Sequence, residues 1–447
     1  MCGITGLLKL KSAEVNVPSY LENMTYALRH RGPDDEGYVL FEGSQAGIFG
    51  GKDTSYDAWN SFYKYSPLKQ IEEATGDYFL GLGHRRLSVI DLSAAGHQPM
   101  CNDAQNIWVI CNGEIYNYIE LREEMKEKGI SFISRSDVEV LLKGYEHYGL
   151  RFLDKINGMW SFVIYDMRDN YLIGCRDRFG VKPFYYYKSD EIFAFASEQK
   201  ALMKLPFQKG INPTAVFDYL ACGKIENSDT GLYSGIKELM PSHYFVYDLN
   251  TWQFEIKKYY TLSYNKQLGT FKKPSADEAV VQTREKIIEA VNIRLRSDVP
   301  VGFCLSGGID SSSIIGVSQQ INVKNNPQQL MGNLVAFTAA TDDKKIDESP
   351  WAEEVVKMNN LRWYVSNCTA DKLFEDLENI IYFQDSPLMH SSTFAQNTVM
   401  KTAREQGIVI LLDGQGGDEL FGGYVPFFIA YYFELLKNFH IGSLMLE

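Results

Sequence analysis

An apolar strand that ends in a glycine turn constrains the fold of this chain more than any other feature. The run from Val299 to Leu305 stops abruptly at the heptapeptide 306–312, Ser-Gly-Gly-Ile-Asp-Ser-Ser. The order strand, glycine turn, helix is typical of an α/β domain whose parallel sheet carries loops at the carboxyl ends of its strands. We therefore expect an α/β parallel-sheet domain over residues 273–447.

The heptapeptide also has the chemistry of a phosphate-binding loop. Its glycines let the backbone approach an anion, its serines offer hydroxyl donors, and the following helix adds N-terminal N–H groups. Asp310 is unsuited to touching a phosphate but suited to a magnesium ion that bridges phosphates. The lysine and four-residue spacer of a Walker loop are absent. A turn that only caps a helix is the structural alternative.

A second glycine-rich loop follows another apolar strand, Ile408 to Leu412. It is also acidic and reads Asp413-Gly-Gln-Gly-Gly-Asp418-Glu-Leu-Phe-Gly-Gly-Tyr424. In an open α/β sheet, ligands bind at the carboxyl ends of the strands. We therefore expect the two loops to close around one triphosphate and its metal.

The cysteine at position 2 predicts a different chemistry at the other end of the chain. Removal of Met1 would leave Cys2 with a thiol and a free α-amino group on one residue. An α-amino group titrates near ~8, so it is a usable base at neutral pH. A nucleophile with its own base can attack an amide carbonyl without a histidine partner. The structural alternative is an incidental cysteine in a mobile terminus.

The first half of the chain, to about residue 205, predicts an α+β domain rather than a regular βαβ repeat. Residues 206–272 contain three prolines and no long period, which indicates a connection and the start of the next domain. The expected strands of the first half are Ile107–Cys111, Trp160–Tyr165 and Tyr171–Cys175, and the expected helices are Ile119–Lys128 and Val138–His147.

Composition excludes several classes of protein. A length of 447 residues favours two domains, and a net charge of −13 argues against a nucleic-acid binder. Seven scattered cysteines without a leader sequence indicate reduced thiols in the cytoplasm. The apolar run Phe427–Leu436 is too short to span a bilayer and contains Glu434, so we interpret it as the start of a buried helix. We expect neither a nucleic-acid nor a membrane partner, and a homodimer is the candidate assembly.

Together with the two glycine loops, six further motifs occur in one order along the chain. They are Met-Cys-Gly-Ile at 1–4, Arg-His-Arg-Gly-Pro-Asp at 29–34, Arg-Leu-Ser-Val-Ile-Asp at 86–91, Asn-Gly-Glu-Ile-Tyr-Asn at 112–117, Ser-Asp at 136–137 and Asp-Arg-Phe-Gly-Val-Lys-Pro at 177–183. Over nearly its whole length the chain thereby resembles the glutamine-dependent asparagine synthetase B family. The resemblance implies a class II glutamine amidotransferase domain over 2–205, with the αββα sandwich of N-terminal-nucleophile proteins, and an ATP pyrophosphatase domain over 273–447.

The resemblance also assigns roles around glutamine. Cys2 would attack the side-chain amide, while the Asn112 amide and the Gly113 N–H would hold the developing oxyanion, at roughly 3–4 kcal/mol for each donor. Arg86 would pair with the glutamine carboxylate as a bidentate fork, unless an internal ion pair with nearby Asp91 engages it. The remaining residues implied to bind glutamine are Leu87, Ser88, Val89, Ile90, Glu114 and Asp137.

In the second domain the resemblance implies that ATP activates a carboxylate as an acyl-adenylate and releases pyrophosphate. Ammonia from Cys2 would cross an internal tunnel and displace AMP, because ammonia released into solvent would be protonated and lost. Asp310 and Asp418 would be magnesium ligands. The residues implied to bind ATP are Leu305 and Ala339 at the adenine, then Ser306, Gly307, Gly308, Asp310, Ser311, Ser312, Asp413 and Gly414.

The chain departs from the family pattern in three places. Gln415 stands where the family usually has a glutamate associated with the adenylate, and Asp413 stands where serine is common. Glutamine cannot act as a base, so the identity of the acceptor is open. Residues 50–80 form an aromatic-rich insertion, which is either a partner or carbohydrate surface or an ordered loop. Family members also continue beyond the position where this chain stops, so the synthetase half is expected to be incomplete.

Four functions follow from these observations. The first is a glutamine-hydrolysing, ATP-dependent asparagine synthetase. The second keeps both half-reactions and amidates another carboxylate, such as a sugar acid in polysaccharide assembly. The third is a regulatory or binding protein that has lost catalysis, against which the intact Cys2, Asn112, Gly113 and Asp310 argue. The last is a stand-alone glutaminase, which would leave the 306–312 loop without a purpose.

Overall fold

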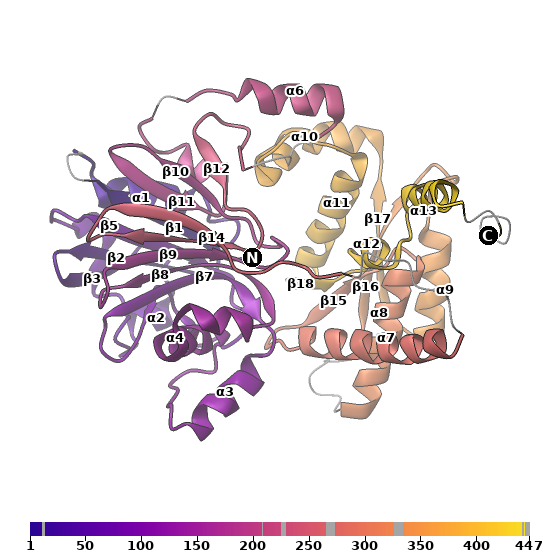
Figure 1. The fold of residues 1–447 in the computed structure, drawn as a ribbon, viewed down its shortest axis with the longest axis horizontal. Helices are drawn as coiled ribbons and strands as arrows, with labels where there is room; N and C mark the ends of the chain where they lie inside the picture. Colours follow the sequence, from indigo (N-terminus) through magenta and orange to yellow (C-terminus); the bar gives the residue numbers. More distant parts are fainter. Residues whose placement is uncertain are drawn as a thin grey trace. The chain divides into compact units, whose positions relative to one another are not determined.

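The chain forms two compact units (Figure 1). The first comprises Met1–Phe271 with Ile381–Met389, and the second comprises Lys272–Ile380 with His390–Glu447. The computed structural model describes residues 1–10, 14–207, 209–224, 229–264, 273–325, 334–439 and 442.

Two β-sheets form the centre of the first unit. The eight-stranded sheet has the order β12 (Ile236–Glu238), β10 (Tyr185–Lys188), β11 (Ile192–Ala196), β1 (Gly3–Lys9), β5 (Leu80–Arg86), β2 (Asp35–Glu42), β3 (Gln45–Gly50) and β4 (Lys69–Gln70). The six-stranded sheet has the order β14 (Gln253–Lys258), β13 (His243–Asp248), β9 (Tyr171–Arg176), β8 (Gly158–Asp166), β7 (Ile107–Ile115) and β6 (Met100–Cys101). The strands pair antiparallel except for the short β3–β4 contact.

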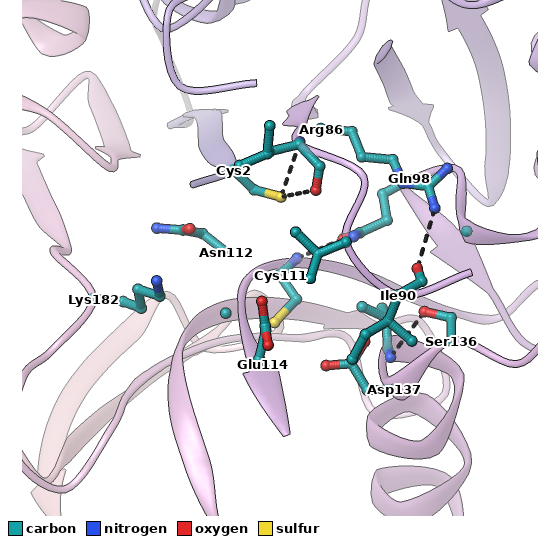
Figure 2. A pocket seen from close by; sticks show the side chains of 15 residues that line it. Cys2, Arg86, Ile90, Gln98, Cys111, Asn112, Glu114, Ser136, Asp137 and Lys182 are labelled. Atoms are coloured by element: carbon teal, nitrogen blue, oxygen red, sulfur yellow. Dashed lines mark hydrogen bonds between the residues drawn. The ribbon is translucent and has the colours of Figure 1, made fainter. Parts of the chain in front are cut away.

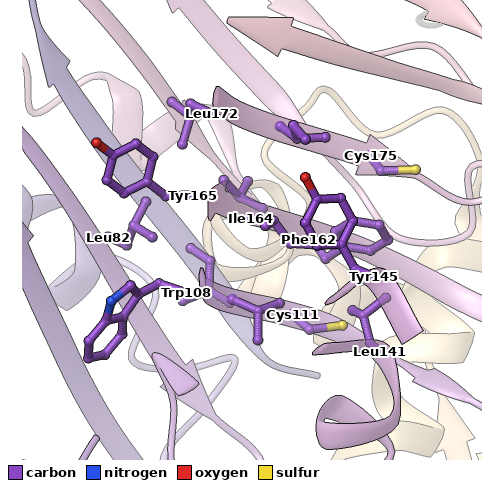
Figure 3. Close-up of a cluster of buried hydrophobic side chains, with 14 of the residues drawn as sticks. Leu82, Trp108, Cys111, Leu141, Tyr145, Phe162, Ile164, Tyr165, Leu172 and Cys175 are labelled. Atoms are coloured by element: carbon purple, nitrogen blue, oxygen red, sulfur yellow. The ribbon is translucent and has the colours of Figure 1, made fainter. Parts of the chain in front are cut away.

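Alternating side chains on β1 show how the layers stack. Ile4 and Leu8 belong to the core shared by the two sheets, whereas Leu7 belongs to the core under helix α1 (Val17–Tyr26). Between the sheets, the ring of Phe41 on β2 meets that of Tyr165 on β8 edge-on, with centroids 4.7 Å apart. Figure 3 shows part of this core. Because a strand side chain points to alternate faces, a sheet buried on both sides needs apolar residues at successive positions.

Helices cover the two outer faces of this sandwich. On the eight-stranded sheet, α1 contacts β1 and β5, and α5 (Gln199–Leu202) contacts β11. On the six-stranded sheet, α4 (Asp137–Tyr148) contacts β7 and packs with α3 (Tyr118–Glu127). The layers therefore follow the order helix, sheet, sheet, helix, which confirms the predicted αββα sandwich. The unit also contains α2 (Tyr56–Trp59), α6 (Pro213–Cys222) and the 3₁₀ turns η1 (Ile71–Glu73), η2 (Ala94–Gly96) and η3 (Gly149–Asp154).

The strands β12 to β14 lie in the segment 206–272 that the sequence indicated as a connection. β12 pairs with β10, and β13 pairs with β9, so this segment extends both sheets of the first unit. Phe245 and Tyr247 on β13 are buried in the shared core. The short strands and frequent polar residues hide this role in the sequence.

The insertion at residues 50–80 is an ordered part of the first unit. Ala58, Tyr65 and Ile71 are buried, and the backbone N–H of Ser55 donates to the carboxylate of Asp35 at 2.8 Å. Phe62 is fully exposed. The segment thus has its own small set of buried residues, as the loop interpretation predicted.

The second unit contains a parallel sheet in the order β17 (Arg362–Cys368), β16 (Val335–Thr341), β15 (Val301–Cys304) and β18 (Ile410–Leu412). This confirms the predicted α/β parallel-sheet class. Helices α8 (Ile309–Asn325) and α9 (Ser349–Asn359) share one core with β15, and α11 (Ser391–Glu405) shares another with β16. The other helices are α7 (Lys273–Arg294), α10 (Ala370–Gln384), α12 (Gly417–Phe421) and α13 (Val425–Lys437).

Helix α13 corrects one expectation. The run Phe427–Leu436 is helical as predicted, but Leu435 is its buried residue, while Phe428 and Phe433 are 50% and 68% exposed. The prediction of burial was wrong. Apolar residues occur on every side of this helix, but the described part of the unit covers only the side that carries Leu435. Within the described residues, no helix combines the length and apolar character that crossing a membrane would require.

Candidate active site

Cys2 lies directly before β1 and is fixed from two sides. The backbone N–H of Leu87 donates to the Cys2 sulfur at 3.4 Å, and the thiol lies 3.7 Å from the Leu87 carbonyl oxygen. The Arg31 Nε–H donates to the Cys2 carbonyl at 2.8 Å, and the Arg31 guanidinium also pairs with Glu198 at 2.8 Å. These contacts hold the thiol in the lining of a pocket (Figure 2).

The pocket collects the residues predicted to bind glutamine from separate parts of the first unit. Arg86 ends β5, which pairs with β1, and Asn112 to Glu114 lie near the end of β7 in the other sheet. Asp137 is the first residue of α4. Ser88 is the predicted residue outside the lining, and its N–H donates to Asp34 at 2.8 Å. The predicted residues that do line the pocket are Cys2, Arg86, Leu87, Val89, Ile90, Asn112, Gly113, Glu114 and Asp137.

The Asn112 side chain is buried and lacks a hydrogen-bond partner. Its exposure is 0%, and neither its amide nitrogen nor its oxygen is hydrogen-bonded in the structure. An unsatisfied buried polar group costs about 1–3 kcal/mol, so natural proteins rarely retain one without a purpose. In the pocket beside Cys2 this amide is available to a substrate oxygen.

Gly113 allows a second donor to face the pocket. It pairs with Trp160 on β8, but the backbone groups of Trp160 bond to Asp177 on the far side of that strand. Gly113 and Trp160 are therefore a non-hydrogen-bonded pair, and the Gly113 N–H points away from β8. A Cβ at this position would stand 2.3 Å from the Met159 carbonyl oxygen, so the close approach requires glycine.

Arg86 is a buried cation held by carbonyl oxygens. Its guanidinium donates to the backbone oxygens of Ser93 at 3.0 Å, Ile90 at 3.5 Å and Asp91 at shorter range. The part of the chain that the structure describes contains no ion pair between Arg86 and a carboxylate. The Asp91 carboxylate instead accepts from Ser93 and from the Arg135 N–H at 2.7 Å. The guanidinium is oriented by carbonyl oxygens, and its charge also lowers the pKa of the Asp35 and Asp91 carboxyl groups, after burial and their hydrogen bonds.

Two carboxylates oppose this cation in the pocket. Burial, together with the nearby Asp137, raises the pKa of Glu114 to about 7. Burial also raises the pKa of Asp137, against the hydrogen bond that its carboxylate accepts from the Ile115 N–H at 2.9 Å. Both carboxylates would be stabilised by a positive charge in the pocket. The site therefore suits a zwitterion, with its carboxylate at Arg86 and its ammonium at the acidic pair.

In the second unit the predicted phosphate loop connects β15 to α8. Gly307 has a φ of +88°, and a Cβ there would lie 2.5 Å from the Ala352 nitrogen. The hydroxyls of Ser306 and Ser311 are 3.1 Å apart, and the buried hydroxyl of Ser312 has no partner in the structure. Tight backbone, clustered hydroxyls and a helix start together form a cradle for an anion.

The backbone of Leu305, implied to contact adenine, is already engaged on both sides. Its N–H donates to the Phe337 carbonyl at 2.9 Å, and its carbonyl accepts from Thr338 at 2.7 Å. Ala339 lies on the adjacent strand β16. A carbonyl oxygen has two lone pairs, so Leu305 retains one acceptor site for a ligand.

The second glycine loop lies against the first, as predicted. β18 pairs directly with β15, and a Cβ on Gly414 would stand 2.8 Å from the Ser311 nitrogen. A Cβ on Gly417 would stand 2.2 Å from a carboxylate oxygen of Asp310. Next to Gly414, the Gln415 N–H donates to the Asp413 carboxylate at 3.0 Å. Both loops thus occupy the edge where the strand order reverses, the usual ligand position in such sheets.

The structure gives the predicted magnesium ligands only indirect support. Asp310 and Asp418 both contribute to the raised pKa of Tyr424, after burial and the neighbouring Glu419, which places both carboxylates near one phenol. Within the described ranges, no group of three or more His, Cys, Asp or Glu side chains could hold a metal ion by itself. Magnesium is commonly bound by one or two carboxylates together with phosphate oxygens, which these two residues fit.

The pocket at Cys2 also contains residues that the sequence analysis did not assign. Lys182 belongs to the quoted motif 177–183, so a signal was present without a role. Gly96 follows two alanines, and nothing in the sequence indicates that it lies against Arg86. The unassigned lining residues are Gly96, Gln98, Cys111, Ser136, Val138 and Lys182.

Comparison with known proteins shows which families and proteins this chain is similar to. The profile of the family described as "Glutamine amidotransferase domain" matches residues 73–260, and that described as "Asparagine synthase" matches residues 282–442. A protein of Methanocaldococcus jannaschii, described as a putative asparagine synthetase (glutamine-hydrolyzing) 2, is 32% identical over 98% of this chain and 78% of its own length. Asparagine synthetase (glutamine-hydrolyzing) 1 of Bacillus subtilis is 31% identical over 95% of this chain and 59% of its own length.

A third relative carries a different name. Amidase chyE of Penicillium rubens is 31% identical over 78% of this chain and 52% of its own length. The chain thus spans about half to three-fifths of the length of the Penicillium and Bacillus relatives. Among solved structures, a glutamine PRPP amidotransferase of Bacillus subtilis aligns at 14% identity over 82% of this chain and 66% of its own, with a TM-score of 0.41, too low to decide the fold.

Proposed function

Because the chain belongs to the family of glutamine-hydrolysing asparagine synthetases, we propose that it takes nitrogen from glutamine at Cys2 and delivers it to a carboxylate activated with ATP. One observation carries the first half of this proposal. The Cys2 thiol shares a pocket with the unpartnered amide of Asn112 and with the guanidinium of Arg86. These groups supply a nucleophile, a donor for an oxyanion and a site for a substrate carboxylate.

The pocket supports a defined order of bond changes. The Cys2 sulfur attacks the side-chain amide carbon of glutamine, and the carbonyl electrons move to the oxygen, which the Asn112 amide and the Gly113 N–H stabilise. The thiol proton passes to the α-amine that removal of Met1 exposes. That proton then goes to the departing nitrogen, which leaves as ammonia. Water releases glutamate from the remaining thioester and regenerates the thiol.

The rest of the pocket would orient glutamine for this attack. Arg86 binds the α-carboxylate, and Glu114 and Asp137 bind the α-ammonium. Leu87, Val89 and Ile90 would line the site between Arg86 and Cys2, and the Leu87 N–H contacts the Cys2 sulfur. A substrate held at both charged groups presents only its side-chain amide to the nucleophile.

We assign the ATP-dependent half to the second unit. Ser306, Ser311 and Ser312, with the backbone of Gly307 and Gly308, would hold the phosphates, and Leu305, Ala339, Asp413 and Gly414 would line the rest of the nucleotide site. Magnesium, when bound through Asp310 and Asp418, would neutralise phosphate charge. The free, scattered cysteines fit a reducing cytoplasm as the setting.

Aspartate is the first acceptor to test, and one residue favours a second candidate. The loop position associated with the adenylate carries Gln415, which cannot accept a proton as a carboxylate would. Relatives of this chain include proteins named amidases as well as asparagine synthetases. A non-aspartate carboxylate, such as a sugar acid, is therefore the alternative acceptor.

The test incubates the full chain with glutamine, magnesium-ATP and aspartate, and measures glutamate, pyrophosphate and asparagine together. Wild type should release all three. Cys2→Ala should release no glutamate, and added ammonium chloride should still support pyrophosphate release and asparagine formation. Glutamate without pyrophosphate or asparagine would direct the search to uronic acids and other carboxylates. No glutamate from wild type, with Met1 shown by mass spectrometry to be removed, would reject the proposal.

A further inference from the structure

Lys182 is a buried lysine in the Cys2 pocket whose ammonium has no assigned role. Its side chain lines the pocket, and the residue is 5% exposed. In Figure 2 it is drawn on the Asn112 side of Cys2, with its nitrogen toward Asn112, while Arg86 lies on the other side. If glutamine extends from Arg86 to the sulfur, Lys182 stands at the end where the amide reacts.

The turn before β10 holds Lys182 in this place. The Lys182 N–H donates to the Asp177 carboxylate at 3.0 Å, and the Lys182 carbonyl accepts from the Arg176 guanidinium at 2.8 Å. The same carboxylate accepts from the N–H groups of Phe179 and Val181, each at 3.0 Å. Two charged side chains thus fix the backbone so that the lysine enters the pocket.

The ammonium itself is not neutralised by contact. In the described chain no hydrogen bond or ion pair involves its Nζ, although Glu114 shares the pocket. Burial lowers the pKa of Lys182, and Glu114 partly reverses that effect. A buried positive charge without a partner is unfavourable. Proteins therefore retain such a charge mainly where it stabilises negative charge that develops during function.

We propose that Lys182 is a positioning residue for glutamine hydrolysis, which acts through Cys2: its ammonium, buried in the same pocket, keeps the Cys2 α-amine in the free-base form. This inference rests on the glutaminase activity proposed above. A neighbouring positive charge opposes protonation of an amine and stabilises a thiolate. In this role Lys182 acts as a fixed charge that supplies and removes no proton.

The charge of Lys182 also acts on the Met1 α-amine, which lies one residue before the proposed base. Burial lowers the pKa of the Met1 α-amino group to about 5, and among the neighbouring groups Lys182 and Arg31 lower it while Cys2 and Glu114 raise it. The amine exposed by removal of Met1 would enter the same field. In that field the charges of Lys182 and Arg31 oppose its protonation, and those of Cys2 and Glu114 favour it.

Of the other charged groups around Cys2, Arg31 acts in the same direction as Lys182. Arg31 contacts the Cys2 carbonyl but is paired with Glu198, which also accepts from His30. Glu114 and Asp137 face the pocket from β7 and α4 and would act in the opposite direction when ionised. Arg86 faces it from β5 and would be neutralised by the substrate carboxylate, and Asp34 is engaged by the Ser88 N–H.

The experiment compares wild type with Lys182→Met, Lys182→Arg and Lys143→Met across pH 6 to 10. Two rates are followed: kcat/KM for glutamine hydrolysis, and alkylation of Cys2 by iodoacetamide, which needs no glutamine. Lys143 is a matched control because it is also buried but pairs with Asp103 outside the pocket. Mass spectrometry confirms that Met1 is removed from each variant.

For Lys182→Met, we expect the rising limb of both profiles to move up by about one pH unit. The activity at pH 7 should fall about tenfold, with much of it recovered at high pH. In Lys182→Arg both rates should rise at the same pH as in wild type, because arginine keeps the positive charge. Lys143→Met should also show the wild-type pH dependence.

Three results would overturn the inference. The first is a loss of activity in Lys182→Met that is equal at every pH. The second is a Lys182→Met profile whose rising limb stays at the wild-type pH. The third is a rising limb that shifts as far in Lys182→Arg as in Lys182→Met. Should Lys182→Met not fold, Lys182→Gln and Lys182→Arg still give the charge comparison. Failure of the proposed function looks different: wild type itself would release no glutamate, while the alkylation profiles would still test Lys182.

Discussion

Gly96 lies against the guanidinium of Arg86 so closely that no side chain fits between them. A Cβ on Gly96 would stand 1.9 Å from Nη2 of Arg86 and 2.9 Å from the carbonyl oxygen of Asp91. The turn η2 that contains Gly96 thus forms a wall of the recess in which the cation lies. The position of the substrate carboxylate depends on this contact.

The substitution Gly96→Ala should therefore weaken glutamine binding without unfolding the first unit. The added methyl displaces the far end of the Arg86 side chain and also crowds the Asp91 carbonyl oxygen at 2.9 Å, so we expect a modest loss of stability beside the loss of binding. Losing a charge-assisted hydrogen-bonded pair costs about 1.5–3 kcal/mol, which corresponds to a KM for glutamine raised by about 10–100-fold. Steady-state glutaminase kinetics measure this effect.

Gly210→Ala is the matched control for that substitution. Gly210 is exposed, and the nearest atom to its Cβ would be the Ser234 hydroxyl at 3.6 Å, an ordinary contact. Its KM should equal that of wild type. An unchanged KM in Gly96→Ala would mean that Arg86 does not bind the substrate carboxylate.

The substitution Asn112→Ala tests the oxyanion donor. Removal of one such donor typically lowers kcat by about 10²–10³-fold. Because both polar atoms of Asn112 are unpartnered in the structure, their removal breaks no internal hydrogen bond, and the thermal midpoint should change little. A large drop in the midpoint, or a loss confined to KM, would assign Asn112 to folding or to binding instead.

The Glu114 carboxyl predicts a pH dependence of glutamine binding. Its pKa is raised to about 7, chiefly by burial, so the group is ionised above pH 7 and neutral below it. An ionised carboxylate attracts the substrate ammonium and a neutral one does not. The KM for glutamine should therefore rise as the pH falls through 7, by about tenfold for each pH unit at most.

Separate fits of KM and kcat against pH isolate this effect from the titration of Cys2. In Glu114→Gln the KM should be high and should no longer depend on pH in this range. A KM that is flat with pH in wild type would show that Glu114 does not face the ammonium.

The agreement between sequence and structure is best where one physical rule fixes the outcome. The loops after Leu305 and after Leu412 were expected to meet, because carboxyl ends of neighbouring parallel strands share an edge, and β15 and β18 are neighbours. Likewise, the cluster of Cys2, Arg86 and Asn112 was implied by motifs, although no local pattern could place three distant segments around one pocket. The resemblance to a family carried that information.

Features that depend on long-range packing were not predictable from local pattern. Gly96 is an ordinary turn residue in sequence, and only the folded loop brings it onto Arg86. The strands β13 and β14 contain alternating polar residues and were interpreted as a connection, yet β13 completes the core with Phe245. The prediction that α13 is buried was wrong for a related reason. An apolar sequence indicates that a helix could be buried, but it does not indicate which elements pack against it.

The contact between Gly417 and Asp310 allows the second unit to be tested separately. A Cβ at Gly417 would lie 2.2 Å from a carboxylate oxygen of Asp310, so Gly417→Ala should displace the proposed magnesium ligand. Pyrophosphate release should fall by about tenfold or more at limiting magnesium and recover in part at high magnesium. Glutamine hydrolysis measured without ATP should stay at the wild-type rate.

Gly316→Ala serves as the control in the same unit. Gly316 lies within α8, and no atom stands within 4 Å of its Cβ, so alanine should be tolerated or slightly stabilising. Equal pyrophosphate release by Gly417→Ala and Gly316→Ala at every magnesium concentration would remove Asp310 from the metal site.

His84 predicts how the stability of the first unit responds to acid. The imidazole is fully buried, its Nε2 lies 3.0 Å from the Cys111 carbonyl, and its Nδ1 has no partner in the structure. Burial lowers the pKa of His84 from 6.5 to about 3, so the folded state keeps the ring neutral while the unfolded chain protonates it. The stabilisation is therefore present above pH 6.5 and is lost as the pH falls toward 3.

Between pH 7 and pH 5 this loss amounts to about 2 kcal/mol. Glu114 acts in the opposite direction over the same range, because its raised pKa favours the folded state as the pH falls, so the wild-type curve alone is not diagnostic. The comparison must be between wild type and His84→Gln, which cannot titrate. The variant should be less stable at pH 7, and the gap between the two thermal midpoints should narrow at pH 5. A gap that is the same at both pH values would show that His84 is not held neutral by the fold.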